Sequence, residues 1–116
     1  MTRLTAGLAA ILSATALATA PAQAEGAKIG MITTLSGGGS HLGIDVRDGF
    51  RLALEEAGRD DVELIVKDDA RKPDVAKAHA DEMIQRDGVD ILTGIIFSNL
   101  ALAVVPSAVR QDVFYL

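Results

Sequence analysis

The sequence predicts an α/β fold in which a parallel sheet carries flanking helices, and two observations support this prediction. Short apolar segments rich in β-branched residues alternate with amphipathic segments in units of about 30 residues. Each amphipathic segment is long enough to return the chain to the same edge of a sheet. Successive strands should therefore run parallel, with one helix between each pair.

Four segments are predicted strands, because each is short, apolar and bounded by turn-forming residues. They comprise residues 29–34, 62–67, 90–96 and 113–116. The spacing between them leaves room for a single helix in every gap.

The first predicted helix follows the glycine-rich stretch LSGGGSHLG, with Ser40 as a candidate N-cap, and ends near Gly58. Its inner stripe is expected to comprise Val46, Phe50, Ala53, Leu54 and Ala57.

The second predicted helix begins at Pro73, a residue suited to a first helical turn, and ends at Gly88. Its inner face is expected to comprise Ala76, Ala80, Met83 and Ile84.

The third predicted helix covers residues 99–110, with Ser98 or Asn99 as its N-cap. Pro106 lies inside this range and lacks the N–H that an interior helical residue donates. We therefore expect Pro106 to bend the helix or to confine its regular part to one side.

Right-handed crossovers leave few topologies for such a chain, and the commonest has the strand order 2-1-3-4. The order reverses between strands 1 and 3, and open α/β sheets bind ligands at such a switch point, beside the carboxyl ends of the strands. The loops at residues 35–43 and 97–99 should border this crevice. We therefore expect a binding site between these loops.

Both loops carry residue types suited to holding an anion. Consecutive glycines leave the backbone accessible, and helix N-termini supply free N–H groups and the positive end of the helix dipole. The hydroxyl of Ser98 would add a donor, Phe97 an apolar wall and His41 a polar or stacking contact. The candidate ligand-binding residues are Ser36, Gly38, Gly39, Ser40, His41, Phe97, Ser98 and Asn99.

These residues also have interpretations that involve no ligand. The glycines would make a flexible loop, Ser98 and Asn99 would cap a helix, Phe97 would belong to the core, and His41 would be an exposed loop residue. The sequence leaves both interpretations open.

Asp68 and Asp69 close the second predicted strand, and we interpret the pair as the start of a polar turn toward Pro73. Two alternatives are that the paired acids bind a metal ion or accept a hydrogen bond from a ribose hydroxyl. A receiver-type phosphorylation site would need an aspartate at the end of a later strand, and residues 93–98 supply none.

Other catalytic and cofactor motifs are missing from the sequence. No GxxxxGK[ST] motif is present, and the glycine that follows Gly37 and Gly39 is Gly43, one place late for a GxGxxG fingerprint. No serine–histidine–acid or cysteine–histidine set stands out. The sequence therefore predicts no catalytic residue, no metal site and no cofactor.

Residues 1–24 have the three zones of an export signal peptide: a basic start at Arg3, an apolar stretch at residues 4–17, and small residues leading to Ala24. The apolar stretch is shorter than the roughly 20 residues that a membrane-spanning helix needs. We expect cleavage after Ala24 and a periplasmic location for residues 25–116.

Removing that leader, which holds one of the 11 basic residues, leaves 92 residues with 10 basic against 16 acidic side chains. Such an acidic chain is a poor match for nucleic acid or anionic lipid. The chain has no cysteine, so neither a disulfide nor a lipid-modified cysteine is available. Its length suffices for one small domain.

Three stretches, LSGGGSHLG, VKDDARKPD and DGVDILTGIIFSN, resemble the amino-terminal part of a periplasmic substrate-binding protein of the branched-chain amino-acid (leucine/isoleucine/valine) type. The similarity covers all of residues 25–116. It implies a type I periplasmic binding protein fold whose two lobes close on a small molecule, perform no chemistry and dock on an ABC transporter permease in the inner membrane. Residues 25–116 would form the first part of lobe 1, with Ser98 at the position from which leucine-type members grip the ligand carboxylate.

Members of this family run to several hundred residues, so the resemblance implies a truncated form with impaired binding. The implied ligand is a branched-chain or related amino acid. The stretch Phe97-Ser98-Asn99 resembles members that take aromatic or other organic acids, and this alternative stays open. Two further classes also remain: a dinucleotide-dependent enzyme that uses the glycine-rich loop for pyrophosphate, and a sensing module fused to a receptor.

Overall fold

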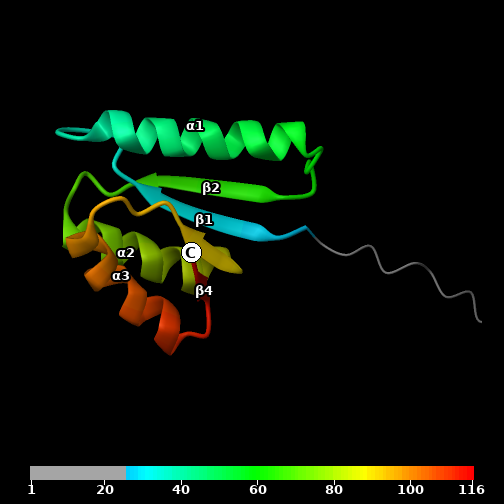
Figure 1. Ribbon diagram of the computed structural model, residues 1–116. Coiled ribbons are helices and arrows are strands. Elements are labelled where there is room, and N and C mark those ends of the chain that lie inside the picture. Colours follow the sequence, from blue (N-terminus) through cyan, green and yellow to red (C-terminus); the bar gives the residue numbers. More distant parts are fainter. Residues whose placement is uncertain (1–25) are drawn as a thin grey trace, which may run out of the picture.

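The computed structural model describes residues 26–116, so the predicted signal peptide at residues 1–24 lies outside the described part of the chain. The described elements alternate between strands and helices, as predicted (Figure 1). In chain order they are β1 (Lys28–Thr33), α1 (Ser40–Glu56), β2 (Glu63–Asp68), α2 (Pro73–Glu82), the π-helix η1 (Met83–Asp87), β3 (Ile91–Thr93), α3 (Ser98–Arg110) and β4 (Phe114–Tyr115).

The strands form one parallel sheet in the order β2-β1-β3-β4, which confirms the predicted fold class and strand order. β1 pairs along its whole length with β2, from Lys28 opposite Glu63 to Thr33 opposite Asp68. Its pairing with β3 is shorter and begins with Ile29 opposite Ile91. The helix α1 covers one face of the sheet, whereas α2 and α3 lie side by side on the other (Figure 1).

The hydrophobic core lies between the sheet and the pair α2 and α3. Its buried members come from β1, β3, both helices and the segment from η1 to Val89, and partly buried residues such as Ile65 and Tyr115 pack around them. The predicted inner face of the second helix is confirmed, since Ala76, Ala80 and Met83 are fully buried and Ile84 packs against them. The buried core residues are Ile32, Ala76, Ala80, Met83, Val89, Leu92, Leu100, Val104 and Ala108.

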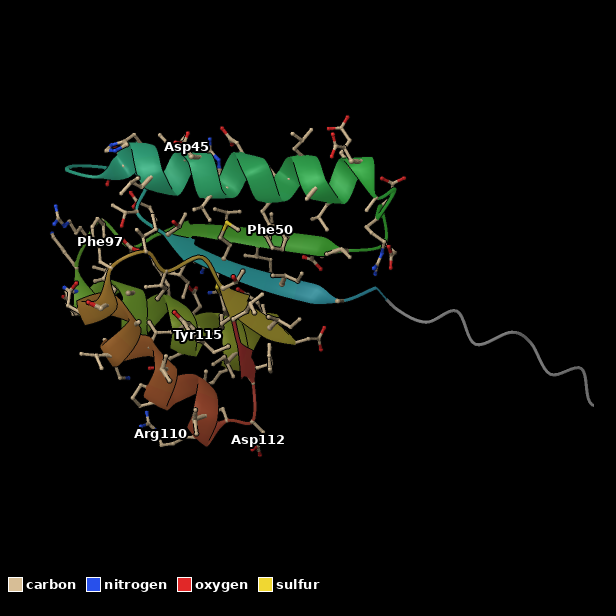
Figure 2. The ribbon with its side chains drawn as sticks, viewed as in Figure 1. Asp45, Phe50, Phe97, Arg110, Asp112 and Tyr115 are labelled. Carbon is tan, nitrogen blue, oxygen red and sulfur yellow. The ribbon has the colours of Figure 1, made fainter. Side chains whose placement is uncertain are left out.

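The opposite face is covered less completely, because α1 is the only described helix that packs on it. Phe50 and Leu54 are half-buried, and Figure 2 shows Phe50 on the side of α1 that faces the sheet. The prediction is wrong for the other three positions of the stripe, because Val46 is 42% exposed and Ala53 and Ala57 are exposed as well. A single helix shields only the positions directly beneath its axis.

The third and fourth strands are shorter than predicted, whereas the first two differ from their predicted bounds by one residue at each end. β3 ends at Thr93 because Gly94 follows with a φ of 96°, a left-handed conformation that breaks the strand. Ile95 and Ile96 therefore belong to the loop that leads to α3, although their composition favours a strand.

The second predicted helix ends at Gly88 as expected, but its last turn is the π-helix η1, and beyond it the N–H of Val89 donates to the carbonyl of Met83 at 3.2 Å. The third helix continues through Pro106, so the expectation that proline would confine its regular part is wrong. The missing N–H would have bonded the carbonyl of Leu102, and both residues lie on the exposed side of α3, where water can replace that donor.

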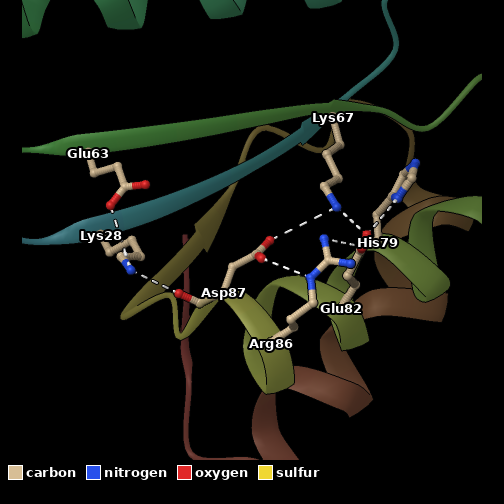
Figure 3. A network of polar contacts seen from close by, with 7 residues as sticks. All are labelled: Lys28, Glu63, Lys67, His79, Glu82, Arg86 and Asp87. Atoms are coloured by element: carbon tan, nitrogen blue, oxygen red, sulfur yellow. Dashed lines mark hydrogen bonds and ion pairs between the residues drawn. The ribbon is translucent and has the colours of Figure 1, made fainter.

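A network of charged side chains joins β1 and β2 to the α2–η1 segment (Figure 3). Lys67 on β2 donates to Glu82, which also pairs with Arg86 one turn later on the helix. The hydrogen bond from Lys67, together with the charges of Arg86 and Lys67, holds the pKa of Glu82 below its usual value although burial opposes this shift. The network comprises Lys28, Glu63, Lys67, His79, Glu82, Arg86 and Asp87.

Two consecutive carboxylates tie the end of β2 to the end of β1. Asp69 is fully buried and accepts a hydrogen bond from Thr34 Oγ1 at 2.7 Å, while Asp68 accepts one from the backbone N–H of Leu35 at 2.8 Å. The interpretation of this pair as a polar turn is confirmed. The carboxylates fix where the chain leaves both strands.

Gly43 allows α1 to lie directly on the end of β1. It is the only buried residue of α1, and a Cβ at this position would lie 1.9 Å from the carbonyl oxygen of Thr34 and 2.9 Å from Thr33 Oγ1. The backbone of β1 cannot move aside without breaking its pairing with both neighbours. Any larger residue must therefore push α1 off the sheet.

We expect Gly43→Ala to lower the free energy of unfolding by about 2–3 kcal/mol, because a backbone clash cannot be relieved by a rotamer change. Urea denaturation followed by circular dichroism measures this. The matched control is Gly49→Ala in the same helix, where a Cβ would meet nothing within 4 Å. That control should be neutral or stabilise by up to about 1 kcal/mol, and equal losses in the two variants would contradict the close packing of Gly43.

The pKa of Asp68 provides a test of the hydrogen bonds that join the ends of β1 and β2. Burial raises this pKa, but the hydrogen bonds from the Ser36 hydroxyl and from the backbone N–H groups of Leu35 and Ala70 outweigh burial and bring it below its usual value. Ionised Asp68 therefore favours the folded state at every pH above its unfolded pKa of about 3.9, and this stability is lost as the pH falls through the lower native pKa.

We expect the unfolding free energy of Asp68→Asn to fall less steeply than that of the wild type below about pH 4, because the asparagine has no such linkage. Urea denaturation at a series of pH values measures both slopes. Asp60→Asn is the control, since Asp60 is exposed and makes no hydrogen bond or ion pair within residues 26–116. If the unfolding free energy had the same pH dependence in Asp68→Asn and in the wild type, the hydrogen bonds of Asp68 would not stabilise the fold.

Candidate ligand-binding site

The loops that follow β1 and β3 meet at the carboxyl end of the sheet, as the switch point requires. Gly39, in the first loop, lies so close to Phe97 that a Cβ would come within 2.8 Å of the ring atom Cζ. Figure 2 shows Phe97 at the end of the molecule where α1 begins. The predicted convergence of the two loops is therefore present.

A third loop, which follows β2, joins them through Arg71. The guanidinium carbon of Arg71 lies 4.4 Å from the centroid of the Phe97 ring, within the range of a cation–π contact. Its Nη1 donates a hydrogen bond to the carbonyl oxygen of Gly38 at 3.3 Å. Arg71 thus connects the loop after β1 with the loop after β3.

Arg71 was not among the residues that the sequence singled out. The predicted site comprises only the loops beside the switch point, and residues 68–73 are predicted to form a turn. A basic residue soon after a neighbouring strand is the only sequence signal, and it does not show that the side chain turns toward Phe97.

The backbone of this turn is unusual, because Ala70 and Arg71 have φ values of 49° and 58° in the left-handed region. Each such residue costs about 1–2 kcal/mol when it is not glycine. Hydrogen bonds offset the cost: the N–H of Ala70 donates to Asp68 Oδ1 at 2.8 Å, and that of Arg71 donates to Asp69 Oδ1 at 2.7 Å. The carboxylates that join the strands therefore also orient Arg71.

The predicted N-caps are wrong at both helices. Gly39, with a φ of 88°, caps α1, and Phe97 caps α3 in an extended conformation, so Ser40 and Ser98 are the first helical residues and not caps. Neither cap residue supplies a side-chain acceptor for the helix N-terminus. The reason is geometric, since the backbone becomes helical one residue earlier than the hydroxyl pattern suggested.

Backbone N–H groups at this rim consequently remain available to a ligand. Those of Ser98 and Asn99 have no acceptor within residues 26–116, and the first intrahelical bonds come from Leu100 and Ala101 to the Phe97 carbonyl. The amide of His41, at the start of α1, also has no acceptor there. Neither helix has an acidic side chain in its first turn to neutralise these donors.

The predicted site residues are distributed unevenly over the rim. Gly38, Gly39 and Phe97 are brought together through Arg71, and Ser98 and Asn99 follow directly with exposed side chains. Ser36 is engaged with Asp68. Within the described residues, no hydrogen bond or ion pair links Ser40 or His41 to the loop after β3.

Phe97 has both of the roles considered from its sequence position. It is half-buried and packs against the main hydrophobic core, while its ring also contacts Gly39 and Arg71 at the rim. Residues 26–116 enclose no pocket at this place or elsewhere. The candidate site is an open rim, with an apolar base and backbone donors at its edge.

We expect Gly39→Ala to lower the free energy of unfolding by about 1 kcal/mol more than Gly37→Ala does. Both glycines have positive φ, so both substitutions carry the left-handed cost, but a Cβ on Gly37 would meet nothing whereas one on Gly39 would press on Phe97. Urea denaturation gives the difference, and the NMR shifts of the Phe97 ring protons should change only in Gly39→Ala. Identical behaviour of the two variants would argue against the loop contact.

Comparison with known proteins places this arrangement in a family. Residues 26–116 match the family model described as periplasmic binding protein. No curated protein matches the chain.

Solved structures show the same fold. An ABC transporter substrate-binding protein from Sphaerobacter thermophilus is 36% identical with a TM-score of 0.75, over 78% of this chain and 26% of that one. A solute-binding protein of Rhodopseudomonas palustris in complex with 3,4-dihydroxybenzoic acid is 30% identical with a TM-score of 0.76, over 79% and 26%. An ABC-type branched-chain amino acid transporter protein from the same species is 33% identical with a TM-score of 0.71, over 76% and 26%.

The alignments thus cover about a quarter of the length of these structures, 26% in each case. Because the family model matches every described residue, this chain belongs to the periplasmic binding protein family.

Proposed function

We propose that this chain forms part of the first lobe of an extracytoplasmic solute-binding protein that delivers a small carboxylic acid to an ABC transporter permease. The observation that carries the proposal is the convergence of the loops after β1 and β3 at Phe97, beside unpaired amides at the start of α3. The family and its solved members support a binding role, since they include ABC transporter substrate-binding proteins.

The ligand carboxylate would lie at the start of α3. The N–H groups of Ser98 and Asn99 point out of the helix end, where the helix dipole favours negative charge, and the exposed Ser98 hydroxyl adds a further donor. Gly38 and Gly39 would let the ligand approach the backbone, with Ser36, Ser40 and His41 at the outer rim. Phe97 would contact the apolar part of the ligand.

The proposed ligand classes are branched-chain or related amino acids and aromatic acids. The first is supported by the similarity to an ABC-type branched-chain amino acid transporter protein, and the second by the similarity to a protein solved with 3,4-dihydroxybenzoic acid. Both classes carry the carboxylate that the rim amides would hold. A dinucleotide-dependent enzyme has no such support from the comparisons.

A periplasmic location, export through a cleaved leader at residues 1–24 and docking on a permease of the inner membrane belong to the same proposal. Within residues 26–116, no helix is long and apolar enough to cross a membrane. The acidic composition gives no support for nucleic acid as a partner.

We propose that the chain by itself binds weakly, with a dissociation constant on the order of 1 mM, because an open rim buries little of a small molecule. NMR titration of the isotope-labelled chain with leucine and with benzoate tests the proposal. Shifts should concentrate at residues 38–41 and 97–99, and Ser98→Ala should weaken binding by about three- to tenfold. Shifts confined to other surfaces, or none with either probe, would refute the proposed function.

A further inference from the structure

We propose that Arg71 is a specificity-determining residue that makes this rim select a solute with net negative charge, an acid without an ammonium group, over a zwitterionic amino acid. The inference rests on the proposed function and names its ligand class. It starts from a side chain to which neither the sequence pattern nor the comparisons assign a role.

The charge of Arg71 has no carboxylate partner. Every ion pair in the described part of the chain involves other side chains, so no acidic oxygen lies within 4.0 Å of this guanidinium. The two acids that precede it in the same turn, Asp68 and Asp69, direct their Oδ1 atoms at backbone N–H groups and at Thr34 instead. Arg71 therefore retains its charge for a ligand.

The guanidinium is also held in place. One face lies over the Phe97 ring, and Nη1 donates to the Gly38 carbonyl, so the contacts come from two loops that also border the proposed site. These contacts use one of the five N–H donors of an arginine. The remaining donors are available, since the residue is exposed.

Asp74, which follows Arg71 by three residues, is exposed in the first turn of α2 and forms no ion pair with Arg71 within residues 26–116. The first turns of α1 and α3 contain no acid, and Lys72, which follows Arg71, is exposed and forms no ion pair among residues 26–116. A carboxylate at the start of α3 would thus meet helix-end amides and a fixed guanidinium together. The guanidinium of Arg71 would repel an ammonium group on the same small ligand.

Charge selectivity distinguishes this role from a structural one. Benzoate and benzamide have nearly the same shape and differ in charge, while leucine carries both a carboxylate and an ammonium group. The variants to compare with the wild type are Arg71→Met, Arg71→Lys and the control Arg51→Met, which removes an exposed arginine of α1 that forms no ion pair within residues 26–116. Both Arg71 variants keep a β-carbon, so the left-handed turn is equally strained in each.

Dissociation constants come from NMR titration of the Ser98 and Asn99 amides in the full chain. Arg71→Met should weaken benzoate binding by about three- to tenfold, as expected for an exposed charge pair. Arg71→Lys should recover part of the loss, Arg51→Met should match the wild type, and benzamide binding should be the same in wild type and Arg71→Met.

Three results would overturn the proposal while leaving the proposed function intact: benzoate binding that does not depend on Arg71, equal losses for benzoate and benzamide, or tighter binding of leucine than of benzoate to the wild type. The last two would indicate a structural role or an amino-acid ligand. If none of the three probes shifts the Ser98 and Asn99 amides, the proposed function and this inference fail together.

Discussion

The hydrogen bonds of Asp68 and Asp69 are the constraint on which the architecture of the edge with the candidate site depends. Their carboxylates hold Thr34 and Leu35, where the chain leaves β1, and they fix the left-handed turn that carries Arg71. Without these acceptors, the ends of β1 and β2 and the left-handed turn would no longer be joined by hydrogen bonds. Two adjacent acids thus join both strand ends to the turn that carries Arg71.

The two faces of the sheet are stabilised in different ways. On the face covered by α2 and α3, small residues such as Ala76 and Ala80 let α2 approach the sheet closely and bury a continuous apolar core with α3. On the opposite face, α1 depends on one glycine contact and on partly buried side chains. The charged network around Glu82 reinforces the already well-packed side. Stability is therefore concentrated away from α1, although α1 supplies one border of the candidate site.

The sequence was sufficient to predict the parallel sheet and its order, because the alternation of strand and helix periods restricts the topology. Local backbone geometry was not predictable to the same degree: Gly94 ends β3 early, and Gly39 and Phe97, not hydroxyl residues, cap the helices. Arg71 could not be identified because its position depends on a contact with Phe97, far along the chain, and on a left-handed turn. Sequence pattern specifies elements, whereas such contacts arise only when the elements pack.

The central place of β1 has a consequence for the order of assembly. Lys28 pairs with Glu63, 35 positions later, but Ile29 pairs with Ile91, 62 positions later. The entropy of loop closure rises with this separation, and sheets that rely on distant parallel pairings fold slowly. The unit from β1 to β2 can close first and serve as the template, while the loop with Phe97 reaches its partners only after a second, longer closure. The edge of the sheet that carries the candidate site is thus completed late in folding.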